Sequence, residues 1–136
     1  MPDPRLGKGL IMSKPANLAK KDLSHVNLAT ADLAGADLHE ASLRNATLKE
    51  TNLEGADLTA ADLSHANLAG AKLRNATASH ANMADADLRD ADLEGTNLRG
   101  AHLAGAKLGD AQRTAAAEAG ADFAATSGEG ESASGD

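Results

Sequence analysis

Histidine offers the widest chemistry in this chain, because an imidazole can act as a general base or as a metal ligand. Five are present: His25, His39, His65, His80 and His102. The chain has no cysteine, which excludes thiolate metal sites and a disulfide framework. It also lacks an HExxH motif, a phosphate-binding glycine loop and a nucleophile–base set. We therefore expect no catalytic site, no metal, no cofactor and no enzymatic activity.

A second concentration of reactive groups is the acidic belt at residues 85–94. Arg89 is the only base within this stretch. Its acids are Asp85, Asp87, Asp90, Asp92 and Glu94. A surface of one sign steers and binds oppositely charged partners, so we interpret the belt as the candidate contact surface for a protein partner. The net charge of −7 argues against nonspecific binding to nucleic acid or to anionic membranes.

These side chains are carried by a tandem array of nineteen pentapeptides, which runs without insertion from residue 16 to residue 110. Alanine dominates the first place, Asp or Asn the second and leucine the third, as in Ala31-Asp32-Leu33. Only Ala78 and Met83 interrupt the leucine column. We expect this column to form the structural core: Leu18, Leu23, Leu28, Leu33, Leu38, Leu43, Leu48, Leu53, Leu58, Leu63, Leu68, Leu73, Leu88, Leu93, Leu98, Leu103 and Leu108.

A period of five fits neither of the common secondary structures. On an α-helix, successive leucines would spiral around the cylinder, and in a flat strand they would alternate between the two faces. The chain keeps every leucine on one side only if it bends once in each pentapeptide. Residues that favour turns fill the remaining places, and glycine recurs at the fifth. The pattern therefore predicts a coiled chain with short straight sides and its leucines inside.

Tandem Ala-Asp/Asn-Leu-x-x sequences of this kind resemble the pentapeptide-repeat family. The resemblance covers about residues 16–110. It implies an all-β fold, a right-handed quadrilateral parallel β-helix with four pentapeptides per coil and about five coils. Third-place leucines and first-place alanines would then face inward, and the other three places outward.

With twenty residues per coil, the histidines do not converge. His25 and His65 would share a face but lie two coils apart, about 10 Å, with Asn45 between them. His80 would come from an adjacent face. Zinc ligands must meet within a few ångström, so we interpret the histidines as solvated surface residues.

The ends of the array need caps, because a solenoid exposes unpaired backbone groups there. We assign residues 1–15 to an N-terminal arm and cap. Downstream, we expect a helical cap over 111–125 with Asp110 as N-cap and Gly120 as C-cap, after which Phe123 covers the last coil. The alternative is two degenerate pentapeptides followed by a genuine one at 121–125. Residues 126–136 read as a disordered acidic tail.

A regular rod without a catalytic site predicts a non-enzymatic interaction or scaffold module whose protein partner is unknown. The family resemblance implies an alternative, a DNA-mimicking protein that binds DNA gyrase and gives resistance or immunity to gyrase inhibitors. Its phosphate-like acids would be Asp32, Asp37, Asp57, Asp62, Asp87, Asp90, Asp92 and Glu94. A homodimer through residues 111–125 would double the rod. The only apolar run before the array, at 10–12, is too short for a signal-peptide core, so we expect a cytoplasmic protein.

Overall fold

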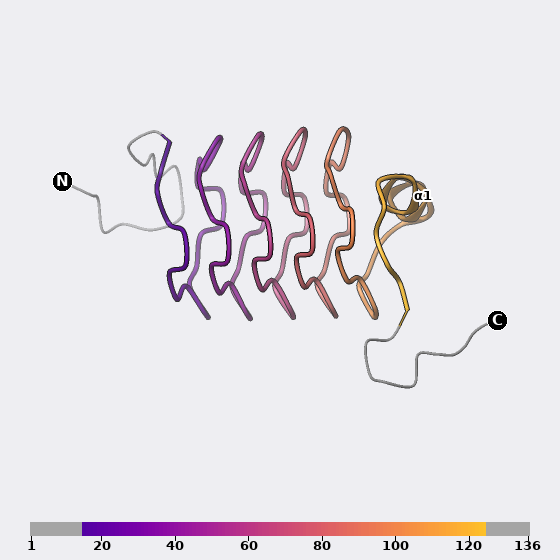
Figure 1. The fold of residues 1–136 in the computed structure, drawn as a ribbon, viewed down its shortest axis with the longest axis horizontal. Coiled ribbons are helices and arrows are strands. Elements are labelled where there is room, and N and C mark those ends of the chain that lie inside the picture. Colours follow the sequence, from indigo (N-terminus) through magenta and orange to yellow (C-terminus); the bar gives the residue numbers. More distant parts are fainter. Residues whose placement is uncertain (1–14, 125–136) are drawn as a thin grey trace.

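The computed structural model describes residues 15–124. They form a stack of coils followed by helix α1 (Asp110–Glu118) at the C-terminal end (Figure 1). The tail predicted at 126–136 and all but the last residue of the predicted arm at 1–15 lie outside the described residues. Within those residues, no helix has the length and apolar character that crossing a membrane requires.

The register of the coils is twenty residues. Isolated parallel bridges join each second-place residue to the residue twenty positions later, from residue 17 through to residue 107. The bonds are short and regular: Leu58 N donates to Thr77 O at 2.6 Å, and Asp57 N donates to Ala36 O at 2.9 Å. Each coil therefore contains four pentapeptides, and equal places of successive coils lie above one another.

We number the four sides of the coil as faces 1 to 4, in chain order. Face 1 begins at residues 16–20, face 2 at 21–25, face 3 at 26–30 and face 4 at 31–35, and each continues at intervals of twenty residues.

Each corner is a β-turn closed by a first-place amide. Ala36 N, for example, donates to Leu33 O at 3.0 Å. The fifth-place residue lies in the left-handed region, with φ of 71° at Gly35 and 59° at Ala60. Second-place Asp and Asn support the turn, because their side-chain oxygen accepts a bond from the fourth-place amide, as from Ala69 N to Asn67 Oδ1 at 3.0 Å. The second place therefore shapes the corner as well as facing outward.

The core is a column of leucines and alanines. Of the predicted leucines, Leu18, Leu23 and Leu108 are partly buried near the ends of the array, and the others are buried. Ala78 and Met83 are fully buried in the same column. Full burial of one leucine contributes roughly 1.5–3 kcal/mol, which explains why this chain needs almost no aromatic residues.

Two first-place threonines are also buried. Thr51 Oγ1 donates to Leu28 O at 2.8 Å, and Thr96 Oγ1 donates to Leu73 O at 2.6 Å. Each hydroxyl therefore bonds a third-place carbonyl of the preceding coil, which offsets the cost of burying it.

Helix α1 starts one residue earlier than the sequence predicted. Gly109 is the N-cap, and its amide donates to Gln112 Oε1 at 2.8 Å. The prediction of Asp110 as N-cap is wrong: Asp110 is the first helical residue, where its charge still suits the positive end of the helix dipole. The C-cap is Ala119 and not the predicted Gly120, which follows it at φ 100° and completes a Schellman motif in which Ala121 N donates to Ala116 O at 3.0 Å.

After α1 the chain returns to the ladder. Asp122 bridges His102 in register, and Asp122 N donates to Ala101 O at 2.7 Å. Residues 110–118 are helical rather than degenerate pentapeptides, whereas 121–123 resume the repeat. Phe123 packs against the core and lies under the Arg113 guanidinium, 4.5 Å from its ring centroid.

Candidate interaction surfaces

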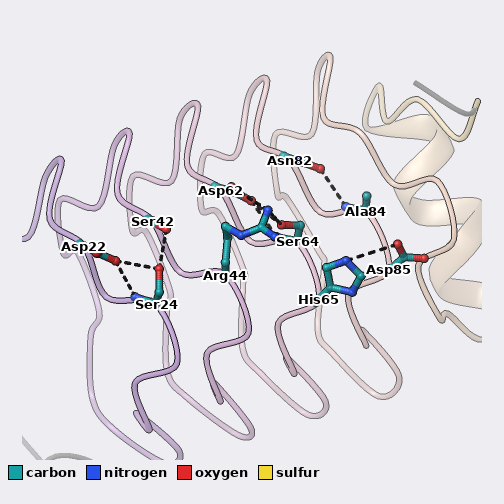
Figure 2. A network of polar contacts seen from close by, with 10 residues as sticks. All are labelled: Asp22, Ser24, Ser42, Arg44, Asp62, Ser64, His65, Asn82, Ala84 and Asp85. Atoms are coloured by element: carbon teal, nitrogen blue, oxygen red, sulfur yellow. Dashed lines mark hydrogen bonds and ion pairs between the residues drawn. The ribbon is translucent and has the colours of Figure 1, made fainter. Parts of the chain in front are cut away.

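Face 2 carries a ladder of polar side chains that links successive coils (Figure 2). Ser24 Oγ donates to Asp22 Oδ1 at 2.7 Å and lies 2.9 Å from Ser42 Oγ. The Ser24 side-chain bond, followed by its backbone amide, lowers the pKa of Asp22 below its ordinary value. The carboxylate is therefore held in its charged form by neighbours that the pentapeptide itself supplies.

The next coils repeat this arrangement with a charge. Ser64 is buried; its hydroxyl donates to Asp62 Oδ1 at 2.7 Å and accepts from Arg44 Nη1 at 3.0 Å. Arg44 Nη1 also lies 3.5 Å from Asp62 Oδ2. His65 follows Ser64 in the chain, yet its imidazole turns toward Asp85, with Nε2 3.7 Å from Oδ2 (Figure 2). The Ser64 hydroxyl is therefore bonded to the Asp62 carboxylate and not to the neighbouring imidazole, so a serine–histidine pair is not formed here.

The predicted acidic belt is not one surface. Asp85 lies on face 2, Asp87 and Asp90 on face 3, and Asp92 and Glu94 on face 4. The five residues wrap around three sides of a single coil, because their spacing in sequence crosses two corners. A flat partner therefore cannot contact all five at once.

Arginines also neutralise much of the belt. Asp87 accepts from Arg89 Nε at 2.9 Å and from Nη2 at 2.7 Å, and the Arg89 side-chain bonds lower the pKa of Asp87 to about 2. Arg74 Nη1 donates to Glu94 Oε1 at 2.7 Å and to Asp92 Oδ2 at 3.2 Å.

Charge is distributed evenly around the rod. When Lys and Arg are counted against Asp and Glu in the array, faces 1, 2 and 3 each carry −1 and face 4 carries −2. The array therefore presents no face of one sign.

Face 1 brings together a group that the sequence analysis missed. One ligand atom from each of Asp37, His39 and Asp57 lies within 4.8 Å of the others. These residues could hold a divalent cation, since imidazole and carboxylate are common metal donors. The group was missed because only histidine–histidine spacing was considered. An Asp-x-His followed at twenty residues by a second Asp was the available signal.

Without a cation, the imidazole itself is the partner of the Asp37 carboxylate. His39 Nδ1 lies 2.6 Å from Asp37 Oδ1. This bond raises the pKa of His39 and lowers the pKa of Asp37.

The other histidines stay apart. His25 and His65 share face 2 two coils from each other, and His80 lies at the outer corner of face 1. His102 is on face 2, where its Nδ1 is buried and has no hydrogen-bond partner among residues 15–124.

Comparison with known proteins gives a consistent picture. The family model of a pentapeptide repeat region matches residues 21–103. A pentapeptide repeat protein (Rfr23) from the cyanobacterium Cyanothece 51142 is 37% identical, with a TM-score of 0.70, over 71% of this chain and 67% of that one. A pentapeptide repeat protein from the Arabidopsis thaliana thylakoid lumen is 31% identical, with a TM-score of 0.60, over 85% of this chain and 84% of that one.

Other comparisons add little. Full-length QnrB1, a plasmid-mediated fluoroquinolone resistance protein, is 16% identical, with a TM-score of 0.22, over 75% of this chain and 71% of that one. A likeness at this level supports no functional inference. No curated protein sequence matches the chain. The resemblance drawn from the Ala-Asp/Asn-Leu-x-x pattern is confirmed by the family match and by the first two structures.

Proposed function

Because the chain belongs to the pentapeptide-repeat family, whose fold is a right-handed β-helix, we propose that it is a non-enzymatic protein-interaction module. It binds a partner protein through the outward side chains of adjacent faces. The array supplies a rigid support, and the second, fourth and fifth places of each pentapeptide supply the contacts.

One observation carries this proposal: the outward polar groups are already fixed in place before any partner binds. On face 2, the bonds Ser24–Ser42 and Arg44–Ser64 join successive coils, and on face 4 Arg74 holds Glu94 in the same way. Immobilising a long side chain costs about 0.5–1.5 kcal/mol on binding. Groups that are ordered in the free protein avoid much of that cost, which is how a small rigid surface gains affinity.

The size of a face limits the partner. The straight part of each pentapeptide covers about three residues, or ~10 Å, and five stacked coils make a rod ~20–25 Å long. One face is therefore smaller than the roughly 800 Å² per partner that a standard interface buries. We expect the partner to contact two adjacent faces and the corner between them.

Site-specific crosslinking tests this expectation. A photo-crosslinking amino acid is placed in turn at four outward sites, one per face: Thr59, Ala84, Lys49 and Lys72. In cells that express the chain, the same partner should crosslink strongly from two neighbouring faces and weakly from the opposite two. Purified partner should then bind the wild type, and arginine at the two reactive sites should weaken binding. Equal crosslinking from all four sites, or none from any, would refute the proposal.

DNA mimicry makes a different prediction and is separated by a supercoiling assay. The pairing of Asp87 with Arg89 and of Glu94 with Arg74 removes acids that would imitate phosphates. We therefore expect neither inhibition nor protection of gyrase at micromolar concentrations of the protein. Inhibition that disappears in the Asp87→Lys, Asp90→Lys double variant would instead favour the gyrase-binding function.

A further inference from the structure

The ladder stops before its last rung on face 4. In the inner coils, third-place and fifth-place amides donate to the next coil, as Leu73 N does to Asp92 O at 2.8 Å and Asn75 N to Glu94 O at 3.0 Å. Leu93 and Gly95 are the equivalent residues one coil later. No described residue accepts from their amides, because the chain has left the ladder to form α1.

The third ladder bond of this edge is replaced rather than lost. In the phase of the repeat, residue 112 is a second-place residue whose backbone amide would donate to Ala91 O. Here the side chain of Gln112 makes that bond instead, with Nε2 2.7 Å from Ala91 O. The acceptor at this edge is therefore satisfied, whereas the two donors have no acceptor among residues 15–124.

A hollow of about 480 Å³ lies beside these donors. On the coil side it is lined by Leu93, Glu94 and Gly95, and on the α1 side by Ala115, Glu118 and Ala119. The edge is therefore open to a ligand rather than filled by the helix. Leu93 and Gly95 lie on either side of a corner, because Thr96 N donates to Leu93 O at 3.1 Å and Gly95 is in the left-handed region with φ of 73°. A segment that reaches both donors must therefore turn as a pentapeptide of the array does.

The charge of the hollow indicates what kind of segment fits. Glu94 and Glu118 line it, and no basic residue does. Glu94 is already paired with Arg74 at 2.7 Å, so Glu118 is the carboxylate that a ligand's cation would meet. Glu118 is in the last turn of α1, and that turn contains no basic residue. A carboxylate there meets the negative end of the helix dipole, an unfavourable arrangement that a cation would relieve.

We propose that this edge binds a short peptide segment of a partner protein that turns as a pentapeptide does and carries a lysine or arginine. Its backbone carbonyls accept from the amides of Leu93 and Gly95, and its cationic side chain pairs with Glu118. This inference rests on the proposed interaction function and gives it a specific site. The segment would extend the ladder by one more coil side, and, as when a strand is added to an open sheet edge, main-chain bonds give affinity and side chains give specificity.

The chain contains its own template for the ligand. On the opposite side of the same rung, residues 71–75 (Ala-Lys-Leu-Arg-Asn) lie in register with 91–95. There Arg74 bonds both Glu94 and Asp92. A second copy of this pentapeptide on the open side would bring the equivalents of Lys72 and Arg74 to the side of the hollow that Glu118 lines.

The probe is therefore the peptide acetyl-Ala-Lys-Leu-Arg-Asn-amide, added to the full chain labelled with ¹⁵N. We expect shift changes confined to the lining of the hollow, and hydrogen exchange of the Leu93 and Gly95 amides that slows by ~10-fold or more because each amide gains an acceptor. Glu118→Lys should weaken binding by ~10-fold or more, since it replaces attraction by repulsion at close range. Glu50→Lys, an exposed change on face 3, is the matched control and should leave binding unchanged. A peptide with glutamate in place of both cations should not bind.

Several outcomes would overturn this inference. They are unchanged exchange of both amides at millimolar peptide, equal binding of the acidic peptide, or equal effects of Glu118→Lys and Glu50→Lys. Protection of the amides without peptide would assign the edge to a second copy if sedimentation shows a dimer, and to residues 125–136 of the same chain if it shows a monomer. If the peptide binds but no partner is crosslinked from the four faces, the peptide site at the edge is supported and the proposed function is refuted. Face crosslinking without peptide binding would refute the edge alone.

Discussion

Replacing Asp87 by asparagine tests whether the acidic belt is free or internally paired. The Asp87 side chain is only 18% exposed and accepts two bonds from the Arg89 guanidinium, at 2.9 Å and 2.7 Å. Asparagine keeps the shape and one side-chain oxygen, so the change removes mainly the charge. Asp90→Asn is the matched control, because Asp90 is exposed in the same pentapeptide and has no ion pair among the described residues.

The expected magnitude follows from the pKa of Asp87. It falls from 3.8 to about 2, chiefly through the Arg89 side-chain bonds, and ~1.8 pKa units correspond to ~2.4 kcal/mol. Arg89 is 60% exposed, so solvent screening reduces the contribution to about 1–1.5 kcal/mol. Because the folded pKa is the lower one, this stability is present above pH 3.8 and is lost as the pH falls toward 2.

Urea unfolding of the wild type and both variants measures these terms. At pH 7, Asp87→Asn should lower the free energy of unfolding by about 1–1.5 kcal/mol, and Asp90→Asn by less than ~0.5 kcal/mol. The difference between wild type and Asp87→Asn should shrink steadily below pH 4 and approach zero near pH 2. A difference that does not change with pH, or an equal loss in Asp90→Asn, would refute the pairing and return Asp87 to the pool of acids available to a partner.

Three further predictions concern the corners, the buried hydroxyls and face 1. Gly55→Ala should change stability by no more than about 1 kcal/mol, since a Cβ there meets nothing within 4 Å and an alanine elsewhere in the array holds the same left-handed turn. Gly120→Ala should cost about 2–3 kcal/mol, because φ is 100° and the new Cβ lies 2.9 Å from the backbone of the last coil; thermal melting compares the two, and equal shifts would contradict the reasoning. Thr51→Val should cost about 1 kcal/mol in urea unfolding, since the carbonyl it leaves still accepts a backbone amide; a loss below ~0.3 kcal/mol would show that the hydroxyl bond adds nothing. The raised pKa of His39 places the stability of its pair with Asp37 below pH 6.5, and this stability is lost as the pH rises through the folded pKa. NMR titration should show the elevated pKa of His39, and Asp37→Asn should lower it, because the bond to Asp37 is the largest cause of the elevation; an unchanged pKa in this variant would contradict the pairing.

The buried core could be predicted from the sequence because it is formed by a residue type that recurs at a fixed interval. A leucine at every fifth residue can stay inside only if the chain turns at every fifth residue, and the twenty-residue register then follows from the family resemblance. The same reasoning correctly predicted that Leu68 and the equivalent leucines of the inner coils are buried in one column. It did not reach the role of Asn67, whose side chain closes the corner, because that bond depends on local backbone geometry rather than on period.

The candidate surface was less readable because sequence proximity misleads in a square coil. Residues 85–94 looked like one patch, but they turn two corners, so Asp85 and Glu94 lie on different faces. The arginine that neutralises Glu94 comes from twenty residues earlier, and the one that neutralises Asp87 comes from two residues later. Spacings of two and twenty, rather than runs of like charge, decide which acids remain unpaired on this fold.

We expect partner choice to be decided at the C-terminal edge of the array, where the regular pentapeptide ladder ends. Leu58 and Leu63 occupy equivalent interior positions, so the column stabilises every coil and distinguishes none of them for a partner. Ladders such as Arg44–Ser64 differ from coil to coil, but they use much of their hydrogen-bonding capacity within the rod. At the C-terminal edge the repeat breaks, and the amides of Leu93 and Gly95, beside Glu118, have no acceptor in the part of the chain that the structure describes. Unmet donors and an uncompensated charge gain most from a partner, so substitutions at this edge should alter partner choice more than equally exposed substitutions at mid-rod.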